Sequence, residues 1–372
     1  MKKFVWRRAM TMARKEVFHI SRDPITMVFA LVLPVVMILL FGVAIEFNPK
    51  DIKLAVSDYD NTQDSRLLIQ QFGSSEYFVP HGSVDVNLAV KDVFSEKAKA
   101  TLIIPPRFEK DVYNGRQAEA QVLLDGADNS TVGAIISYVG TISSLANERI
   151  AGFDARRPYH LRTRFLFNPE LNSKWFAIPG LAVVVMTVLS ILLTALTVAR
   201  EWESGSMELL LSTPVTPLEI TVGKILPYSV LCMVAVVMVY IVARTVFGVP
   251  FVGNYWIFGL GCILFLICYL AEGLFISIRT RKQQLALQFG MVIGLLPTNL
   301  LSGFIFPISS MPKFFQYFTM LFPARWFVDI ARDAFLKGSG IHDLWEPFLA
   351  LLISAAILIF VSVKTFKRDL EP

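Results

Sequence analysis

The chain has 372 residues, of which 54% are hydrophobic and only 17% charged. Ordinary soluble domains carry about 25% charged residues, so this chain lacks the polar surface that contact with water on all sides requires. Its net charge of +5 does not indicate a nucleic-acid partner, because the basic residues cluster at the ends of apolar runs rather than on one face. The three cysteines fall inside apolar runs, so no disulfide framework is predicted.

Residues 1–24 are basic and carry apolar side chains at helical spacing. This pattern predicts an amphipathic connecting helix that lies on the cytoplasmic face of a bilayer. No small-residue cleavage site accompanies the first apolar run, so we do not expect a cleaved signal peptide. The apolar positions are Trp6, Met10, Ala13, Val17 and Ile20.

Six apolar runs approach or exceed the length of about 20 residues that a helix needs to cross the hydrocarbon of a bilayer. Basic residues precede the first run and follow the fourth and the sixth. The positive-inside rule therefore predicts that both termini are cytoplasmic. The fifth run contains Gly290, Gly294 and Pro297, which membrane helices tolerate. The predicted spans are Ile25–Ile45, Phe176–Ala199, Ile225–Phe247, Tyr255–Ile278, Leu285–Phe306 and Trp345–Val363.

An aromatic stretch, Phe314–Phe327, could be mistaken for a seventh crossing. It contains Pro323 and Arg325, and a further crossing would place the basic C-terminus outside. Aromatic side chains prefer the membrane boundary. We therefore expect segment 308–344 to lie at the outer interface, or to enter the membrane and return.

Residues 46–174 form a long polar insertion between the first and second runs. Runs typical of strands alternate there with runs typical of helices, which predicts a compact extracytoplasmic α/β domain. The predicted strands are Lys53–Ser57, Ala100–Ile104 and Glu119–Leu124, and the predicted helices are Gln63–Phe72, Arg107–Tyr113 and Thr131–Ala151.

The sequence contains no catalytic or metal-binding motif that we recognise. A phosphate-binding loop of the form G-x-x-x-x-G-K-[ST] is absent, and the four histidines are scattered. Asp58, Asp60 and Asp64 resemble part of a calcium loop, but the glycine and the distal glutamate of that loop are missing. We expect these aspartates to be solvated turn residues. The sequence predicts neither an ATPase nor a metal site in this chain.

Glu272 lies inside the fourth apolar run, where a charged side chain is costly and usually functional. We expect it to face the interior of the helix bundle or a water-filled cavity, as a possible residue of a transport pathway. Arg244, near the outer end of the third run, can instead extend its guanidinium to the interface.

The predicted cytoplasmic segment 200–224 carries four glutamates against two basic residues, contrary to the charge rule. Thr216-Pro217-Leu218-Glu219 is a capping box, which predicts that a new helix starts there and continues into the third span. Before it, a short amphipathic helix is predicted, with Glu208 away from its apolar face. Because lipid-surface helices are usually basic, an acidic one favours a protein partner. The apolar face consists of Met207, Leu210 and Leu211.

This segment reads Glu201-x-Glu203-x-Gly205-Ser206-x-Glu208-x-Leu210-Leu211, followed by Pro214, Thr216 and Glu219. The run resembles the cytoplasmic signature of type-2 ABC exporter permeases. The resemblance covers the whole chain and includes Leu54–Asp60, Gln283-Gln284 and Leu301-Ser302-Gly303. It is closest to the bacterial multidrug-type branch with a large external domain. Glu272 departs from the family pattern, in which a small or hydroxyl residue is usual.

The resemblance implies a half-transporter in a bacterial inner membrane, with a second copy or a sister permease completing the pathway. It also implies a separate cytoplasmic ABC ATPase subunit that binds ATP and Mg²⁺, so this chain binds no cofactor directly. Drug-like or amphiphilic substrates and a periplasmic adaptor are further expectations. A single coupling helix over Glu201–Leu211 would receive the motion of the ATPase. The implied coupling residues are Glu201, Glu203, Gly205, Ser206, Glu208, Leu210, Leu211, Pro214 and Glu219.

Two other function classes remain as alternatives. A membrane receptor or sensor would bind a ligand in its extracytoplasmic domain, but receptors rarely need six spans and no cytoplasmic output domain is evident. A secondary carrier would predict inverted repeats and several charges at the membrane midplane, and we find neither in the sequence.

Overall fold

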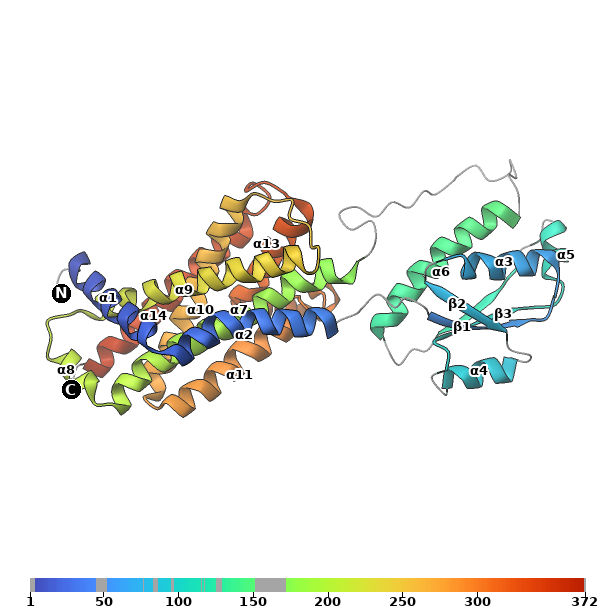
Figure 1. Cartoon of the computed structure of the whole chain (residues 1–372). Coiled ribbons are helices and arrows are strands. Elements are labelled where there is room, and N and C mark those ends of the chain that lie inside the picture. Colours follow the sequence, from blue (N-terminus) through green and yellow to red (C-terminus); the bar gives the residue numbers. More distant parts are fainter. Residues whose placement is uncertain are drawn as a thin grey trace. The chain divides into compact units, whose positions relative to one another are not determined.

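The computed structural model describes residues 4–44, 52–75, 77–82, 86–94, 97–114, 116, 118–124, 129–150 and 172–370. The chain divides into two compact units. The first, here called the helical unit, consists of Met1–Ile45 and Lys174–Pro372, and the second, the sheet unit, consists of Glu46–Ser173. Each unit has its own hydrophobic core, and Figure 1 shows the elements of both.

Within the described residues, six helices of the helical unit are long and apolar enough to cross a membrane. They correspond to the six predicted spans, so the chain is a polytopic α-helical membrane protein. These helices are α2 (Pro24–Ala44), α7 (Ser173–Glu203), α9 (Pro217–Thr245), α10 (Tyr255–Thr280), α11 (Gln283–Leu301) and α14 (Trp345–Leu370).

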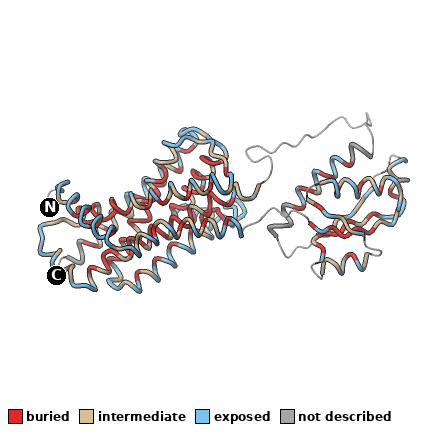
Figure 2. The backbone as a smooth tube through the Cα atoms, viewed as in Figure 1, coloured by how far each residue is buried: buried red, intermediate tan, exposed pale blue. Residues whose placement is uncertain are grey.

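Helices α7 and α10 form the centre of the helical unit. In the apolar stretch of each of these two helices, about three quarters of the residues are buried (78% and 72%). In α2, α11 and α14, only about a fifth of the corresponding residues are buried (22%, 22% and 17%). Figure 2 shows this concentration of buried positions inside the bundle. A glycine sets the close approach of the two central helices, because a Cβ at Gly273 of α10 would collide with the carbonyl oxygen of Ile191 and the hydroxyl of Thr194 on α7. The Ser277 hydroxyl also accepts the backbone N–H groups of Val198 and Ala199, at 3.0 and 2.9 Å.

The fifth span ends earlier than predicted. The sequence predicted Leu285–Phe306, but α11 ends at Leu301. Gly303 has a φ of +81°, a left-handed conformation that favours glycine. Arg332 donates hydrogen bonds to the carbonyls of Gly303 and Phe304, at 3.0 and 3.1 Å. These bonds satisfy carbonyls that a continuing helix would have used, so the turn is stable without further helix.

The segment predicted at the outer interface consists of short helices. They are η1 (Ile308–Ser310), α12 (Lys313–Phe318), η2 (Thr319–Leu321), α13 (Pro323–Arg332) and η3 (Asp333–Lys337). Neither α12 nor α13 has the length needed to cross a bilayer. Arg325 holds the turn between them, donating to the Gln316 carbonyl and the Thr319 hydroxyl, both at 2.6 Å.

The apolar stripe of helix α1 (Trp6–Arg22) is only partly covered by the rest of the helical unit. Ala13 and Ile20 are buried in the helical unit, whereas Trp6, Met10 and Val17 are exposed. The five predicted positions share one side of the helix, and the other helices cover only one edge of that side. Helix α1 packs against α9, where a Cβ at Gly223 would lie 2.6 Å from Met12 Cβ.

The sheet unit contains a four-stranded sheet of order β2-β1-β3-β4, in which β1 is parallel to β2 and β3, and β4 is antiparallel to β3. Helices α3 and α6 cover one face, where they share a core with β1, and α4 covers the other (Figure 1). The strands are β1 (Ile52–Asp58), β2 (Phe78–Gly82), β3 (Ala100–Ile104) and β4 (Gln121–Leu124). The helices are α3 (Gln63–Gly73), α4 (Val86–Phe94), α5 (Phe108–Tyr113) and α6 (Asn129–Ile150).

The sequence reasoning identified β1, β3, β4, α3, α5 and α6 but missed β2 and α4. Strand β2 contains Pro80 and ends at Gly82, residues that usually argue against a strand. A proline is tolerated there because β2 lies at the edge of the sheet. Ala151, at the end of the predicted long helix, lies outside the described residues.

We predict that Gly273→Ala destabilises the protein by about 1–3 kcal/mol, because the added methyl group must separate α7 from α10. The matched control is Gly259→Ala on the same helix, where no atom lies within 4 Å of the new Cβ. That control should be neutral or slightly stabilising, since alanine favours a helix over glycine. Unfolding temperatures in detergent measure both, and equal values for the two variants would contradict the close packing.

Candidate functional site

The predicted coupling segment 200–224 consists of three parts. Helix α7 continues to Glu203, a separate helix α8 spans Ser206–Leu211, and α9 begins at Pro217. Gly205 lies at the first junction with a φ of +72°, a conformation that glycine adopts readily. The prediction of one coupling helix over Glu201–Leu211 is therefore wrong, because the turn at Gly205 separates Glu201 and Glu203 from α8.

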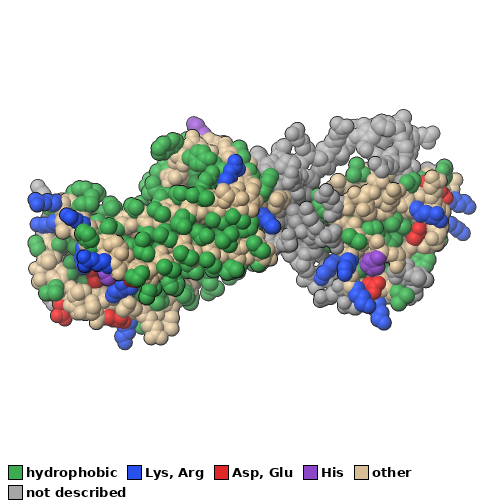
Figure 3. Space-filling model, viewed as in Figure 1, with side chains coloured by type: hydrophobic (Ala, Val, Ile, Leu, Met, Phe, Trp, Pro, Cys, Tyr) green, Lys and Arg blue, Asp and Glu red, His purple; other side chains and the backbone are tan. Residues whose placement is uncertain are grey.

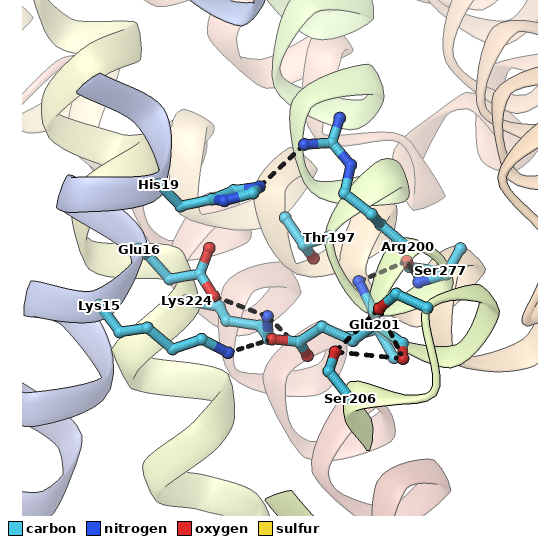
Figure 4. Close-up of polar contacts among 12 residues, drawn as sticks. Lys15, Glu16, His19, Thr197, Arg200, Glu201, Ser206, Lys224 and Ser277 are labelled. Carbon is cyan, nitrogen blue, oxygen red and sulfur yellow. Dashed lines mark hydrogen bonds and ion pairs between the residues drawn. The ribbon is translucent and has the colours of Figure 1, made fainter. Parts of the chain in front are cut away.

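Glu201 belongs to a cluster of charged side chains that is buried except for the half-exposed Lys15 (Figure 4). Its Oε1 lies 2.7 Å from Lys15 Nζ, and its Oε2 lies 3.0 Å from Lys224 Nζ. Lys224 Nζ is also 2.8 Å from Glu16 Oε1. The side chains of Lys224 and Glu16 are only 1% and 4% exposed. We call these four residues the charge cluster; it joins α1, α7 and α9.

The charge cluster contains two positive and two negative groups, so its formal charge balances. Burial of an unpaired charge is costly, whereas pairing and hydrogen bonding offset much of the cost. The Tyr228 hydroxyl supports the cluster by donating to Glu16 Oε2 at 3.5 Å. The three helices are consequently restrained relative to one another, because displacement of any one would leave a buried charge without its partner.

Arg200 forms a second contact between α7 and the start of the chain. Its Nη1 lies 2.8 Å from His19 Nε2 and 3.3 Å from Asp23 Oδ2. The Thr26 hydroxyl donates to Asp23 at 2.7 Å and, against the opposing effect of burial, holds the pKa of Asp23 below its ordinary value. Arg200 acts in the same direction. A pocket of about 200 Å³ lies beside these residues and is lined by residues of α1, α2, α7, α8 and α9.

Glu219 is turned inward, away from the exposed surface. Its carboxylate accepts the backbone N–H groups of Val5 and Thr216, each at 2.7 Å. Thr216 and Glu219 thereby form the predicted capping box at the start of α9, which confirms that motif. Pro214 accepts a hydrogen bond from Arg8 through its carbonyl, at 2.8 Å. Both residues connect the loop to α1.

Helix α8 is anchored on one side and exposed on the other. Met207 is 1% exposed and lies in the main core, against which Leu210 also packs. The prediction that these residues offer an apolar face to a partner is therefore wrong for Met207, whereas Leu210 is only partly buried and the side chain of Leu211 lies outside the described part of the structure. Leu209 is 74% exposed and Glu208 is exposed beside it. Sequence reasoning missed Leu209 because three consecutive leucines give no periodicity from which an inward side can be inferred.

Ser206 and Glu203 connect the ends of neighbouring helices. The Ser206 hydroxyl donates to the Glu201 carbonyl at 3.3 Å, across the turn at Gly205. Glu203 accepts hydrogen bonds from the backbone N–H of Gln283, at 2.9 Å, and from the Gln283 side chain. The Arg281 guanidinium also lies 4.5 Å from the centroid of the Trp202 ring. Motion at the end of α7 would therefore also reach the start of α11.

The structure brings nine of the predicted site residues to one end of the helical unit, while Glu272 lies apart from them on α10. Figure 3 shows Lys and Arg side chains gathered at this end and hydrophobic side chains covering the middle of the unit. Glu203, Gly205 and Glu208 are exposed there, whereas Glu201 and Glu219 are internal. The same end thus contains a buried structural part and an exposed surface.

We predict that Lys224→Met destabilises the folded protein by about 3–5 kcal/mol, because it leaves Glu16 and Glu201 buried without their shared cation. The control is Lys282→Met, an exposed lysine at the same end of the helical unit. Adding Glu16→Gln to Lys224→Met should restore part of the lost stability, since one of the uncompensated charges is removed. Thermal unfolding in detergent measures all three variants. A Lys224→Met protein as stable as the Lys282→Met control would rule out this account of the cluster.

Comparison with known proteins identifies similar chains. A family model described as ABC-2 family transporter protein matches residues 24–364, a region that includes the first five spans and all but the last residues of the sixth. The chain is 32% identical to the probable multidrug ABC transporter permease YbhS of Escherichia coli K12, over 98% of each chain. It is 27% identical to the probable multidrug ABC transporter permease YbhR of the same organism, over 98% of this chain and 99% of YbhR. The E. coli inner membrane transport permease YhhJ is 29% identical over 85% of each chain.

Proposed function

Because this chain belongs to the ABC-2 family of transporter proteins, we propose that it is the membrane permease of an ATP-driven exporter and receives its energy through α8 from a separate cytoplasmic ABC ATPase subunit. Membership in a transporter family favours this function over the receptor alternative. The names of YbhS and YbhR as probable multidrug permeases support drug-like or amphiphilic substrates. ATP and Mg²⁺ would be bound by the partner subunit.

The observation that carries this proposal is that α8 is fixed to the core on one side and exposed on the other. Its exposed Leu209 and Glu208 offer a surface to a partner, while Met207 holds the helix against the core. A partner that displaces α8 would pull on α7 through the short turn at Gly205 and the Ser206–Glu201 hydrogen bond. Because α7 is the most buried span, its movement would reach the centre of the bundle.

The sidedness of the chain follows from charge. Helix α8 and both termini lie at one end of the helical unit, and the end of α2 and the start of α7 lie at the other (Figure 1). The end with α8 carries the basic loops, which the positive-inside rule assigns to the cytoplasm. The sheet unit, inserted between α2 and α7, is then extracytoplasmic. By analogy with the E. coli inner membrane permease YhhJ, the membrane would be a bacterial inner membrane.

A second permease completes the proposed assembly. In a single copy, most residues in the apolar stretches of α2, α11 and α14 are not buried. A second copy or a sister permease would cover part of this surface and form the transport pathway between the two chains, and lipid would cover the rest. The sheet unit would be the part available to a periplasmic adaptor.

We predict that Leu209→Asp and Glu208→Lys each weaken capture of a co-expressed ABC ATPase subunit by at least about tenfold. Central contacts in protein interfaces commonly contribute about 2 kcal/mol or more, and both changes reverse the chemistry of the exposed face of α8. Glu346→Lys, which alters an exposed glutamate in the first turn of α14, is the control. Affinity purification followed by quantification of the ATPase subunit gives the result. Full capture by both α8 variants would contradict the docking assignment.

We also predict that cysteines placed at Leu209 and at Tyr113 react from opposite sides of the membrane. Tyr113 is 82% exposed on α5 of the sheet unit, and the three native cysteines are buried. A membrane-impermeant maleimide should label Tyr113→Cys in intact spheroplasts and Leu209→Cys only in inverted vesicles. The unmodified chain, whose cysteines are all buried, gives the background. Labelling of both variants from one side would overturn the proposed topology.

A further inference from the structure

Glu272 lies about two helical turns inside the span formed by α10. Eight residues separate it from Thr280 at the end of the helix, a rise of about 12 Å. Side chains on a helix lean toward its N-terminus. In the orientation proposed above, α10 begins outside and ends in the cytoplasm, so the Glu272 side chain leans away from the nearer water. It is therefore poorly placed to extend its carboxylate to the cytoplasmic interface.

Among the described residues, Glu272 has neither a hydrogen-bond partner nor an ion-pair partner. Its titratable neighbours on the same face of α10 are Cys268 and Tyr269, and both make contacts elsewhere. The Cys268 thiol donates to the Leu351 carbonyl at 3.5 Å, and the Tyr269 hydroxyl accepts the Ala324 N–H at 3.0 Å. The charge cluster, in contrast, pairs both of its buried carboxylates with lysine. Glu272 is therefore a carboxylate with no counter-charge among the residues that the structure describes.

Glu272 and Phe275 are less buried than the residues around them on α10. From Cys268 to Ile278 every side chain is buried except Glu272 and Phe275, which are partly exposed. Residues three positions apart lie on the same side of a helix. An acidic group and an aromatic ring are therefore neighbours on the partly exposed side of this half of α10.

We propose that Glu272 and Phe275 form a recognition site for an amphiphilic organic cation, the substrate class of this permease. This inference rests on the proposed function. A carboxylate without a partner at membrane depth is stabilised by a cation, and the face of an aromatic ring also attracts positive charge. The described residues contain no group of three His, Cys, Asp or Glu side chains of the kind that holds a metal ion. An amphiphilic organic cation suits the site better than a metal ion does, because its apolar part can enter the membrane and contact Phe275.

Two probes of matched shape and opposite charge test the site directly. Tetraphenylphosphonium is a lipophilic cation, and tetraphenylborate is an anion of nearly the same size. Binding of each to the purified full-length chain in detergent is measured by equilibrium dialysis. The variants are Glu272→Gln, Glu272→Asp and Phe275→Leu, with Glu346→Gln as an exposed control. Thermal unfolding verifies that each variant is folded.

We expect the wild-type chain and Glu346→Gln to bind tetraphenylphosphonium in preference to tetraphenylborate. Glu272→Gln should weaken cation binding by about tenfold or more, because interactions with a charged group are strong where water is excluded. Glu272→Asp should retain part of the affinity, and Phe275→Leu should lower it to a smaller extent. Equal binding of the two probes, or unchanged cation binding by a folded Glu272→Gln protein, would overturn the proposal. A carboxylate that only carries protons would give that second result.

Cation binding by the chain alone does not require the ATPase subunit, so the two proposals fail separately. If the wild-type chain does not capture the ATPase subunit, the coupling function is contradicted, but the measurement of cation binding is unaffected. If the ATPase subunit is captured normally but the cation and the anion bind equally well, only the proposed substrate class is contradicted.

Discussion

At the end of the helical unit that carries α8, the charged side chains of Lys224, Glu16 and Glu201 are held largely out of water. Lys224 lies between Glu16 and Glu201, and Lys15 completes the charge balance from α1. A buried ion is tolerated only while its partners stay within contact distance. This requirement restrains α1, α7 and α9 together, and it explains why a basic, amphipathic first helix lies against the bundle.

The arrangement of the loop between α7 and α9 depends on the same restraint. Glu201 holds the last turns of α7 in place, and Glu219 ties the start of α9 to Val5 at the beginning of the chain. Between these two fixed points, α8 packs against the core through Met207 and leaves Glu208 and Leu209 exposed. A small exposed helix between rigid supports transmits a displacement instead of absorbing it, and in the proposed exporter this property serves the coupling of ATP hydrolysis to transport.

Two kinds of glutamate in the helical unit show how the protein uses buried charge. Glu201 and Glu16 are paired, so their charges contribute to the architecture. Glu272 has no partner within the described residues and lies beside the partly exposed Phe275. An uncompensated charge raises the free energy of the unliganded chain, and a cationic ligand recovers that energy on binding. The stability of the charge cluster and the proposed specificity at Glu272 therefore both depend on the free-energy cost of burying a charge.

The sequence by itself determined the six spans, the capping box at Thr216 and Glu219, and strands β1 and β3, because these features depend on local length, apolarity and spacing. Tertiary structure decided which glutamates face inward, since Glu201 and Glu208 have the same chemistry and differ only in what surrounds them. The lysine that pairs with Glu201 at 2.7 Å is 186 positions away. Strand β2 likewise needs its neighbour β1, and Leu209 is distinguished from Met207 only by the core that buries one of them. Local patterns record the periodicity of a helix or strand, whereas the partner of a side chain is set by helix packing between residues far apart in the chain.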